Sequence, residues 1–171
     1  ALYKATQYIV QNGIQGDFVE CGVWKGGQAM LVAKTLIQEG DTSRKIFLFD
    51  TFSGMTEPSK EDFHIADGSA AGDIWKSKKT DSHNEWCYAP LEEVKKNIAQ
   101  TKYPENNIFY EKGIVEESIP SALPLKIAIL RLDTDWYEST SHELVHAYPR
   151  LVSGGVLIID DYGTWAGSRK A

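Results

Sequence analysis

The chain has 171 residues, of which 42% are hydrophobic and 25% charged, and its formal net charge is -6 at pH 7. This length fits one domain that buries a sizeable core. The acidic balance, with no long basic block, argues against nucleic acid or an anionic membrane as a partner.

Targeting signals and cysteine usage bear on the location of the protein. No apolar run reaches the ~20 residues that a membrane-spanning helix needs, and no charged-then-apolar signal segment opens the sequence. Cys21 and Cys87 form no CxxC pair, so they are expected to be reduced thiols. These features predict a cytoplasmic protein that binds small molecules.

The first 38 residues predict a helix, a strand and a second helix. Apolar and aromatic residues at positions 3–11, followed by Asn12-Gly13, predict a short packing helix. Residues 18–21 have the composition of a brief strand, and residues 27–38 have the apolar spacing of a helix. A glycine-rich turn joins this strand to this helix.

The glycine-rich turn is the first candidate binding feature. Gly22, Gly26 and Gly27 would let backbone N–H groups approach a ligand at a helix N-terminus. Their spacing, G-x-x-x-G-G, differs from the dinucleotide fingerprint, and Glu20 would repel a pyrophosphate. The turn therefore favours a cationic or hydroxyl-rich ligand, unless it is only a tight connection between two elements.

The second predicted strand, residues 46–49, ends at Asp50. An acid at this position of a β-α-β unit can accept hydrogen bonds from a ribose diol, although a turn or cap aspartate is an equal alternative. Periodicity then fails from residue 51 to residue 90, where scattered aromatic side chains argue against pure disorder. We expect residues 53–89 to form a mobile lid or a flexible insertion.

The remainder of the chain alternates helices and strands. An amphipathic helix is predicted at 91–101, strands at 107–110, 127–132 and 156–159, and a helix at 138–148. This order predicts an α/β fold with a doubly wound parallel sheet in a single domain, residues 1–171. Because the chain stops where another helix should begin, we expect a fragment truncated on its C-terminal side.

Acids follow the last two predicted strands, which are expected to be buried. The four acids are Asp133, Asp135, Asp160 and Asp161. In open α/β sheets the carboxyl ends of the strands share one crevice, so these carboxylates should converge there. A fold tolerates such repulsion mainly where a cation or a proton-transfer task compensates it.

Two short motifs suggest other chemistry. The helix at 138–148 contains H-E-x-x-H, the motif of zinc proteases. A core stripe is expected on this helix at Ser141, Leu144, Val145 and Tyr148, which would leave His142 and His146 solvated on a flank. The run DTDWYEST is similar to the nucleophile motif of haloacid-dehalogenase-like phosphatases. In that family the motif lies on the first strand, whereas here only one strand and one lysine, Lys170, follow it.

Four ordered blocks, FVECGVWKGG, FLFDTFSGM, ILRLDTDWYEST and GGVLIIDDYG, together resemble the macrocin O-methyltransferase family. The resemblance runs from about Asp17 to the last residue. It implies a Rossmann-like fold of the class I methyltransferase type, and Mg²⁺-dependent methyl transfer from S-adenosylmethionine to sugar hydroxyls of natural products such as macrolides. Antibiotic biosynthesis is the implied setting.

The resemblance also implies roles for individual residues. Cofactor-binding positions would be Glu20, Gly22, Gly26, Gly27, Asp50, Thr51, Gly113, Ile114 and Asp133. Metal ligands would be Asp133, Asp160 and Asp161, and the general base would be Asp135. Oxygen ligands of this kind suit Mg²⁺.

Other interpretations stay open at this stage. A domain that binds S-adenosylmethionine without catalysis is one, and a phosphatase is a weaker one. The acceptor hydroxyl and the oligomeric state, a homo-oligomer included, do not follow from the sequence.

Overall fold

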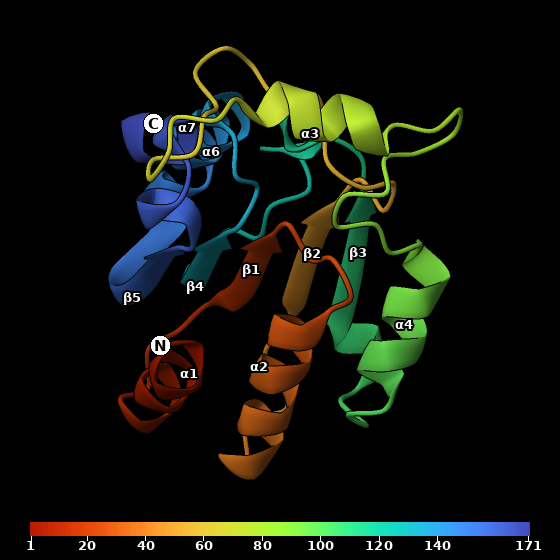
Figure 1. Ribbon diagram of the computed structural model, residues 1–171. Coiled ribbons are helices and arrows are strands. Elements are labelled where there is room, and N and C mark those ends of the chain that lie inside the picture. Colours follow the sequence, from red (N-terminus) through yellow and green to blue (C-terminus); the bar gives the residue numbers. More distant parts are fainter.

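The computed structural model describes all residues from Ala1 to Ala171 and contains one five-stranded sheet (Figure 1). The strands are β1 (Asp17–Cys21), β2 (Ile46–Asp50), β3 (Ile108–Lys112), β4 (Ile127–Leu132) and β5 (Leu151–Ile159). Their order is β3-β2-β1-β4-β5, and all four pairings are parallel. The predicted doubly wound parallel sheet is therefore confirmed.

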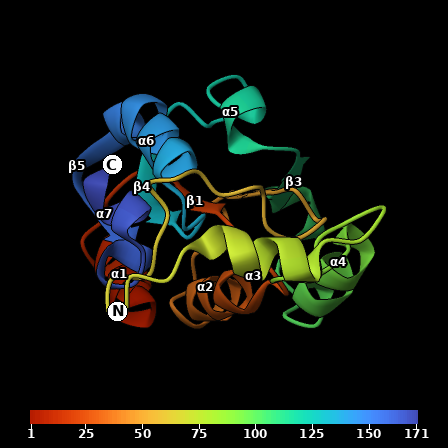
Figure 2. The same ribbon diagram turned by 45° about the horizontal axis from the view of Figure 1, so that its top comes forward.

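Helices cover both faces of the sheet (Figure 2). The helices of the chain are α1 (Leu2–Gln11), α2 (Gly27–Gln38), α3 (Ala71–Lys78), α4 (Leu91–Ala99), α5 (Val115–Ser118), α6 (Tyr137–His146) and α7 (Ala166–Lys170), of which α3 lies beyond the carboxyl ends of the strands (Figure 1). Alternate strand residues point to opposite faces, so Phe18 and Leu48 pack in the core under α1, α2 and α4. Val19 and Phe49 pack in the second core, under α5 and α6.

The last strand differs from its predicted form. It begins at Leu151, earlier than expected, and residues Val156 to Ile159 are only half-buried. The expectation of a fully buried strand was wrong for β5, because it pairs with β4 alone and lies at the edge of the sheet.

The segment between β2 and α4 is more regular than its sequence suggested. It contains α3, whose buried side chains Ala71 and Trp75 lie four residues apart on one face. The Trp75 indole N–H donates to the Met55 carbonyl (2.8 Å), and Asn84 donates to the Trp75 carbonyl (2.8 Å). The expectation that residues 51–90 lack secondary structure was therefore wrong. Mobility of residues 53–89 stays a prediction.

Helix α6 presents a different face to the core from the one expected. Its buried residues are Ser139, Thr140 and Glu143, whereas Val145 is 63% exposed and Tyr148, just beyond the helix, is 52% exposed. The predicted core stripe was wrong, because polar side chains take the buried positions: Ser139 donates to the Trp136 carbonyl and Glu143 accepts the Thr134 hydroxyl.

Both cysteines are unpaired, as predicted; Cys21 is buried and Cys87 is exposed. None of the helices combines the length and apolar character that crossing a membrane requires.

Candidate active site

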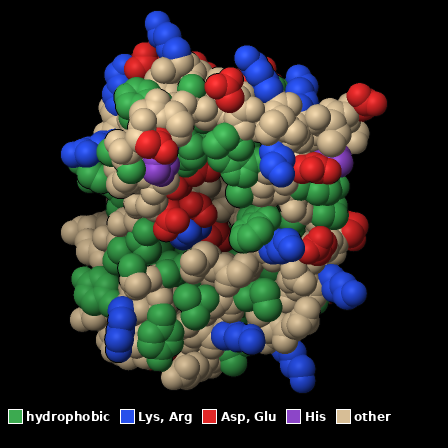
Figure 3. Space-filling view, viewed as in Figure 1, with side chains coloured by type: hydrophobic (Ala, Val, Ile, Leu, Met, Phe, Trp, Pro, Cys, Tyr) green, Lys and Arg blue, Asp and Glu red, His purple; other side chains and the backbone are tan.

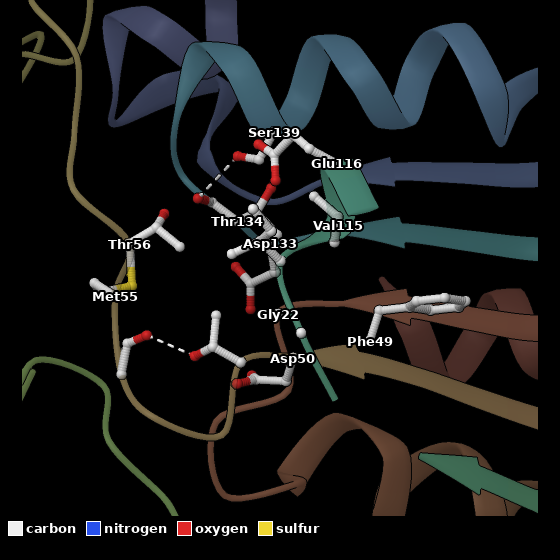
Figure 4. Close-up of a pocket in the computed structure, with 14 residues that line it drawn as sticks. Gly22, Phe49, Asp50, Met55, Thr56, Val115, Glu116, Asp133, Thr134 and Ser139 are labelled. Carbon is white, nitrogen blue, oxygen red and sulfur yellow. Dashed lines mark hydrogen bonds between the residues drawn. The ribbon is translucent and has the colours of Figure 1, made fainter. Parts of the chain in front are cut away.

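A pocket lies at the carboxyl ends of the strands, with an empty volume of about 430 Å³ (Figure 4). Acidic side chains gather in a hollow on this side of the molecule (Figure 3). Six of the predicted cofactor-binding residues line the pocket: Gly22, Asp50, Thr51, Gly113, Ile114 and Asp133. The sheet therefore brings together residues from β1, β2, β3 and β4.

Gly22 allows the end of β1 to pass close to the end of β4. Its φ is 81°, and a Cβ at this position would lie 2.0 Å from the Asp133 carbonyl oxygen. The Asp133 N–H donates to the Cys21 carbonyl at 2.8 Å. Any side chain at position 22 would therefore separate the two strand ends that form the floor of the pocket.

Asp50 organises the glycine-rich turn as well as lining the pocket. Its Oδ2 accepts hydrogen bonds from the backbone N–H groups of Val23 (2.7 Å) and Trp24 (3.1 Å). Its Oδ1 accepts the N–H of Phe52 at 2.7 Å. A carboxylate has about four acceptor positions, so one remains for a hydroxyl in the pocket.

Gly26 and Gly27 do not line the pocket. Gly26 precedes α2 with a φ of 81°, and a Cβ there would meet Ile98 and Val94 of α4 at 3.2 to 3.3 Å. Gly27 has open space around its Cα. The conformation of Gly26 thus has a packing reason, and cofactor binding by these two glycines stays a prediction.

Three aspartates form a potential metal site beside the pocket. Each of Asp133, Asp160 and Asp161 offers one carboxylate oxygen, and these atoms all lie within 4.8 Å of one another. Asp161 Oδ2 is buried and has no hydrogen-bond partner. A buried oxygen without a donor costs free energy unless a ligand satisfies it.

Arg131, on β4, lies beneath the aspartates and was not predicted as a site residue. Its Nη1 donates to Glu20 Oε1 (2.9 Å) and to Asp133 Oδ2 (2.7 Å). Its Nη2 lies 3.1 Å from Asp160 Oδ1, and the side chain is only 5% exposed. The guanidinium therefore joins the glycine-turn strand to the metal-site carboxylates.

A signal for Arg131 was present in the sequence. It is the one charged residue in the otherwise apolar strand IAILRL, and Glu20 lies at the matching register of the neighbouring strand. Two opposite charges inside adjacent buried strands indicate an ion pair. The remaining unpredicted residues of the pocket are Phe49, Gly54, Met55, Thr56, Val115, Glu116, Thr134 and Ser139.

The carboxyl groups titrate abnormally because they are crowded and poorly hydrated. Burial raises the pKa of Glu20 to about 8, against the opposing effect of Arg131. Burial likewise raises the pKa of Asp133 to about 7. Burial, followed by a hydrogen bond with Asp161, raises the pKa of Asp135 to about 9. One guanidinium does not balance this set of acids, so a further cation would be stabilising.

Asp135 has an unusual backbone. Its φ of 65° lies in the left-handed region, which only a few per cent of non-glycine residues adopt, Asp more often than most. It sits between β4 and α6 and does not line the pocket itself. Such strain persists only where the surrounding structure holds it.

The H-E-x-x-H residues do not converge on a zinc site. The rings of His142 and His146 lie 4.4 Å apart, and both are partly buried rather than fully solvated. Glu143 is fully buried on another face, where it accepts the Thr134 hydroxyl at 3.0 Å. Because Glu143 is buried on a different face of the helix from the two histidines, it could not reach a metal that they held.

A parallel sheet with a polar pocket beyond its strand ends defines a doubly wound α/β protein that binds its ligand at this edge of the sheet. The model of the macrocin O-methyltransferase family matches residues 1–171, and the chain belongs to this family. Family membership favours a methyltransferase over the phosphatase that DTDWYEST suggested.

Relatives with assigned activities are named as O-methyltransferases. The chain is 34% identical over 161 residues to an 8-demethyl-8-(2,3-dimethoxy-alpha-L-rhamnosyl)-tetracenomycin-C 4'-O-methyltransferase of Streptomyces olivaceus, covering 94% of the chain and 58% of that protein. It is 30% identical over 164 residues to the mycinamicin III 3''-O-methyltransferase of Micromonospora griseorubida, covering 94% and 61%. The chain thus spans about three fifths of the length of these relatives.

Solved structures show the same fold. The O-methyltransferase NovP superposes with a TM-score of 0.82 at 27% identity, covering 99% of this chain and 66% of NovP. The calicheamicin methyltransferase CalS11 superposes with a TM-score of 0.76 at 19% identity, covering 99% and 66%, which is a likeness of fold. The predicted methyltransferase type of sheet is therefore confirmed.

Proposed function

We propose that the protein transfers a methyl group from S-adenosylmethionine to a hydroxyl of a sugar, or of another vicinal diol, in a glycosylated natural product. The relatives that carry this proposal act, by their names, on a rhamnosyl tetracenomycin and on mycinamicin III. The pocket lies beyond the carboxyl ends of the strands, where open α/β sheets bind small molecules. A cytoplasmic location and a homo-oligomeric state stay predictions.

The residues around the pocket suit the methyl donor, which supplies an electrophilic methyl group on a sulfonium. Glu20 is not part of the pocket lining and is 1% exposed, but its Oε2 has no hydrogen-bond partner, so it could accept a hydrogen bond from an ammonium group. Asp50 has one free acceptor position for a ribose hydroxyl. Gly113 and Ile114 form the far wall, where we assign the adenine.

Asp133, Asp160 and Asp161 suit a hard divalent cation. Their oxygens cluster within 4.8 Å, and the partnerless Asp161 Oδ2 is directed into a buried space. Mg²⁺ prefers oxygen ligands and keeps several waters. When bound it would supply a Lewis acid that lowers the pKa of an acceptor hydroxyl.

Asp135 is the proposed general base. Its carboxyl is crowded by Asp161 and Asp133, which helps to raise its pKa to about 9. A carboxyl must be ionised to accept a proton, and a cation held by the neighbouring aspartates would lower the pKa of Asp135 and favour its ionised form. Its fixed position beside the other acids would direct it at the acceptor hydroxyl.

One observation carries the proposal: Asp133 belongs both to the pocket and to the acid cluster. Any molecule in the pocket would lie directly beside a cation held by the three aspartates. Proximity of this kind is what transfer between a bound donor and a bound acceptor requires.

Calorimetry with S-adenosylmethionine, with and without Mg²⁺, tests the binding step. Mass spectrometry of mycinamicin III and of rhamnosides with adjacent free hydroxyls, incubated with both ligands, tests transfer. We expect binding and the addition of one methyl group. Binding without any transfer would favour a non-catalytic domain, and no binding would overturn both readings.

Variants separate the two acid roles. Asp133→Asn and Asp160→Asn should lose Mg²⁺-dependent turnover, and folded variants that methylate normally in EDTA would exclude the metal role. Asp135→Asn should lose at least about 100-fold in kcat while still binding both ligands. Unchanged turnover in that variant would remove the general-base assignment.

A further inference from the structure

Asp62 joins the segment before α3 to the start of α6. It is 1% exposed, and its Oδ2 accepts the backbone N–H (2.7 Å) and the hydroxyl (2.9 Å) of Ser59. Its Oδ1 accepts the backbone N–H of Tyr137, the first residue of α6, at 2.8 Å. Helix α6 has no capping side chain of its own at this end, so Asp62 supplies one from 75 residues away.

The same segment holds the two residues that follow Asp135. The Trp136 indole N–H donates to the Thr56 carbonyl at 3.0 Å, and the next residue, Tyr137, donates to Asp62. Trp136 is 3% exposed. Two fixed donors immediately after a residue with a φ of 65° are the external restraint that this strained conformation needs.

Residues 63–65 contact the turn after β5, which carries Asp160 and Asp161. The Ala166 N–H donates to the Phe63 carbonyl and the Ile65 N–H to the Thr164 carbonyl, each at 2.9 Å. These bonds flank Trp165, whose own N–H donates to the Asp161 carbonyl at 3.0 Å. The loop before α3 lies beside α6 and α7 in both ribbon views (Figures 1 and 2). Residues 56–65 therefore contact both the turn that contains Asp135 and the turn that contains Asp161.

A tryptophan cluster, defined as Trp86, Trp136 and Trp165, fills the space between these turns. The Trp136 and Trp165 ring centroids lie 5.2 Å apart, and Trp86 lies 5.6 and 5.9 Å from them. Gly167 leaves room for Asp62, because a Cβ at position 167 would lie 1.8 Å from Asp62 Oδ1 and 2.8 Å from the Tyr137 nitrogen. The contact among Asp62, Tyr137 and Gly167 is therefore closely fitted.

We propose that Asp62 is a positioning residue for methyl transfer, which holds the Asp135 turn in register with the Asp161 turn through Tyr137. This inference rests on the proposed function and adds a residue outside the pocket's acids to it. Asp62 does not line the pocket at the strand ends. Its proposed role is to fix the direction of the Asp135 carboxylate through Tyr137. A displacement of about 1 Å in such a group can lower a rate about 100-fold.

The test compares Asp62→Ala, Gly167→Ala and Asp62→Asn with the wild-type protein. Asp62→Ala removes the acceptor, Gly167→Ala displaces it, and Asp62→Asn keeps an oxygen for the Tyr137 N–H. Asp67→Ala is the matched control, because Asp67 caps the Ser69 N–H in the same segment but is exposed and touches neither turn. Kinetics at saturating S-adenosylmethionine and Mg²⁺, hydrogen exchange of residues 136–140, and calorimetric Kd values are measured.

We expect kcat to fall about 10- to 100-fold in Asp62→Ala and Gly167→Ala, with faster exchange at residues 136–140 and a Kd for S-adenosylmethionine within about threefold of wild type. Asp62→Asn should recover most of kcat, and Asp67→Ala should match wild type. A general packing role would instead lower thermal stability, kcat and cofactor affinity together, without rescue by Asn.

The two failures are distinguishable. A wild-type protein that binds the donor but methylates nothing overturns the proposed function. An active wild type whose Asp62→Ala variant keeps its kcat, or loses kcat and cofactor affinity in the same proportion, overturns the positioning role alone.

Discussion

At the residue scale, Arg131 determines how the acids at the strand ends are tolerated. Its side chain is 5% exposed and meets Glu20, Asp133 and Asp160 within 3.1 Å. Burying a charge is costly unless it is paired, and removing one partner of a buried pair leaves the other uncompensated. Arg131 is therefore a structural requirement of the site as well as part of its electrostatics.

Substitution of Arg131 should be strongly destabilising. We expect Arg131→Ala to lower the free energy of unfolding by about 3 to 5 kcal/mol, because Glu20 and Asp133 lose their cation. Urea unfolding measures this, with the exposed Arg169→Ala as control, which should stay within about 0.5 kcal/mol of wild type. Adding Glu20→Gln to Arg131→Ala should recover part of the loss; a purely additive double variant would contradict the coupling.

At the scale of elements, α6 shows why sequence periodicity misassigned a helix face. Apolar spacing pointed to Val145 and Tyr148, yet the buried positions are Ser139, Thr140 and Glu143. Polar side chains can face a core when hydrogen bonds satisfy them, as the Thr134 hydroxyl does for Glu143. The spacing of hydrophobic residues in a sequence does not show which polar side chains will find such partners.

The burial of Glu143 makes the stability of this element depend on pH. Desolvation raises the pKa of Glu143 well above its usual 4.5. The folded chain therefore binds this proton more tightly than the unfolded chain, so its stabilising effect is complete below about pH 4.5 and is lost as pH rises. Glu143→Gln, which imitates the protonated form, should lose less unfolding free energy than wild type between about pH 5 and pH 8.

Urea unfolding at about pH 5 and pH 8 measures the slope of the free energy of unfolding against pH. The exposed Glu92→Gln is the control and should keep the wild-type slope. An equal slope in Glu143→Gln and wild type would mean that Glu143 is ionised in the folded protein.

The strand ends could be predicted from sequence because parallel strands are apolar, short and followed by polar turns. The convergence of Asp133, Asp160 and Asp161 follows from that topology alone. The tryptophan cluster could not be predicted, because its members lie on three segments far apart in the chain with no periodic relation. Helix α3 was missed for a related reason: Ala71 and Trp75 make a buried face only once the loops around them are folded.

At the scale of the whole molecule, the excess of acids should couple stability to divalent cations. The Arg131 guanidinium pairs with Glu20, Asp133 and Asp160, and two further acids, Asp135 and Asp161, lie close to these aspartates without a cation of their own. Mg²⁺ at 100 times its Kd should raise Tm by about 5 to 10 °C, since binding to the folded state alone adds about 2.7 kcal/mol.

Differential scanning fluorimetry measures this shift, and EDTA should reverse it. Asp160→Asn should abolish it, whereas Asp67→Asn, in an exposed loop, should retain it. A shift that persists in Asp160→Asn would place the cation elsewhere on the molecule.

The ion pair between Glu20 and Arg131 also bears on how the chain is made. The two residues lie 111 positions apart, in the adjacent strands β1 and β4. A ribosome adds about 5 to 20 residues per second, so Glu20 emerges several seconds before its counter-ion exists. The glycine-rich turn therefore cannot reach its final form on a nascent chain that ends before β4, and its assembly is a late event in biosynthesis.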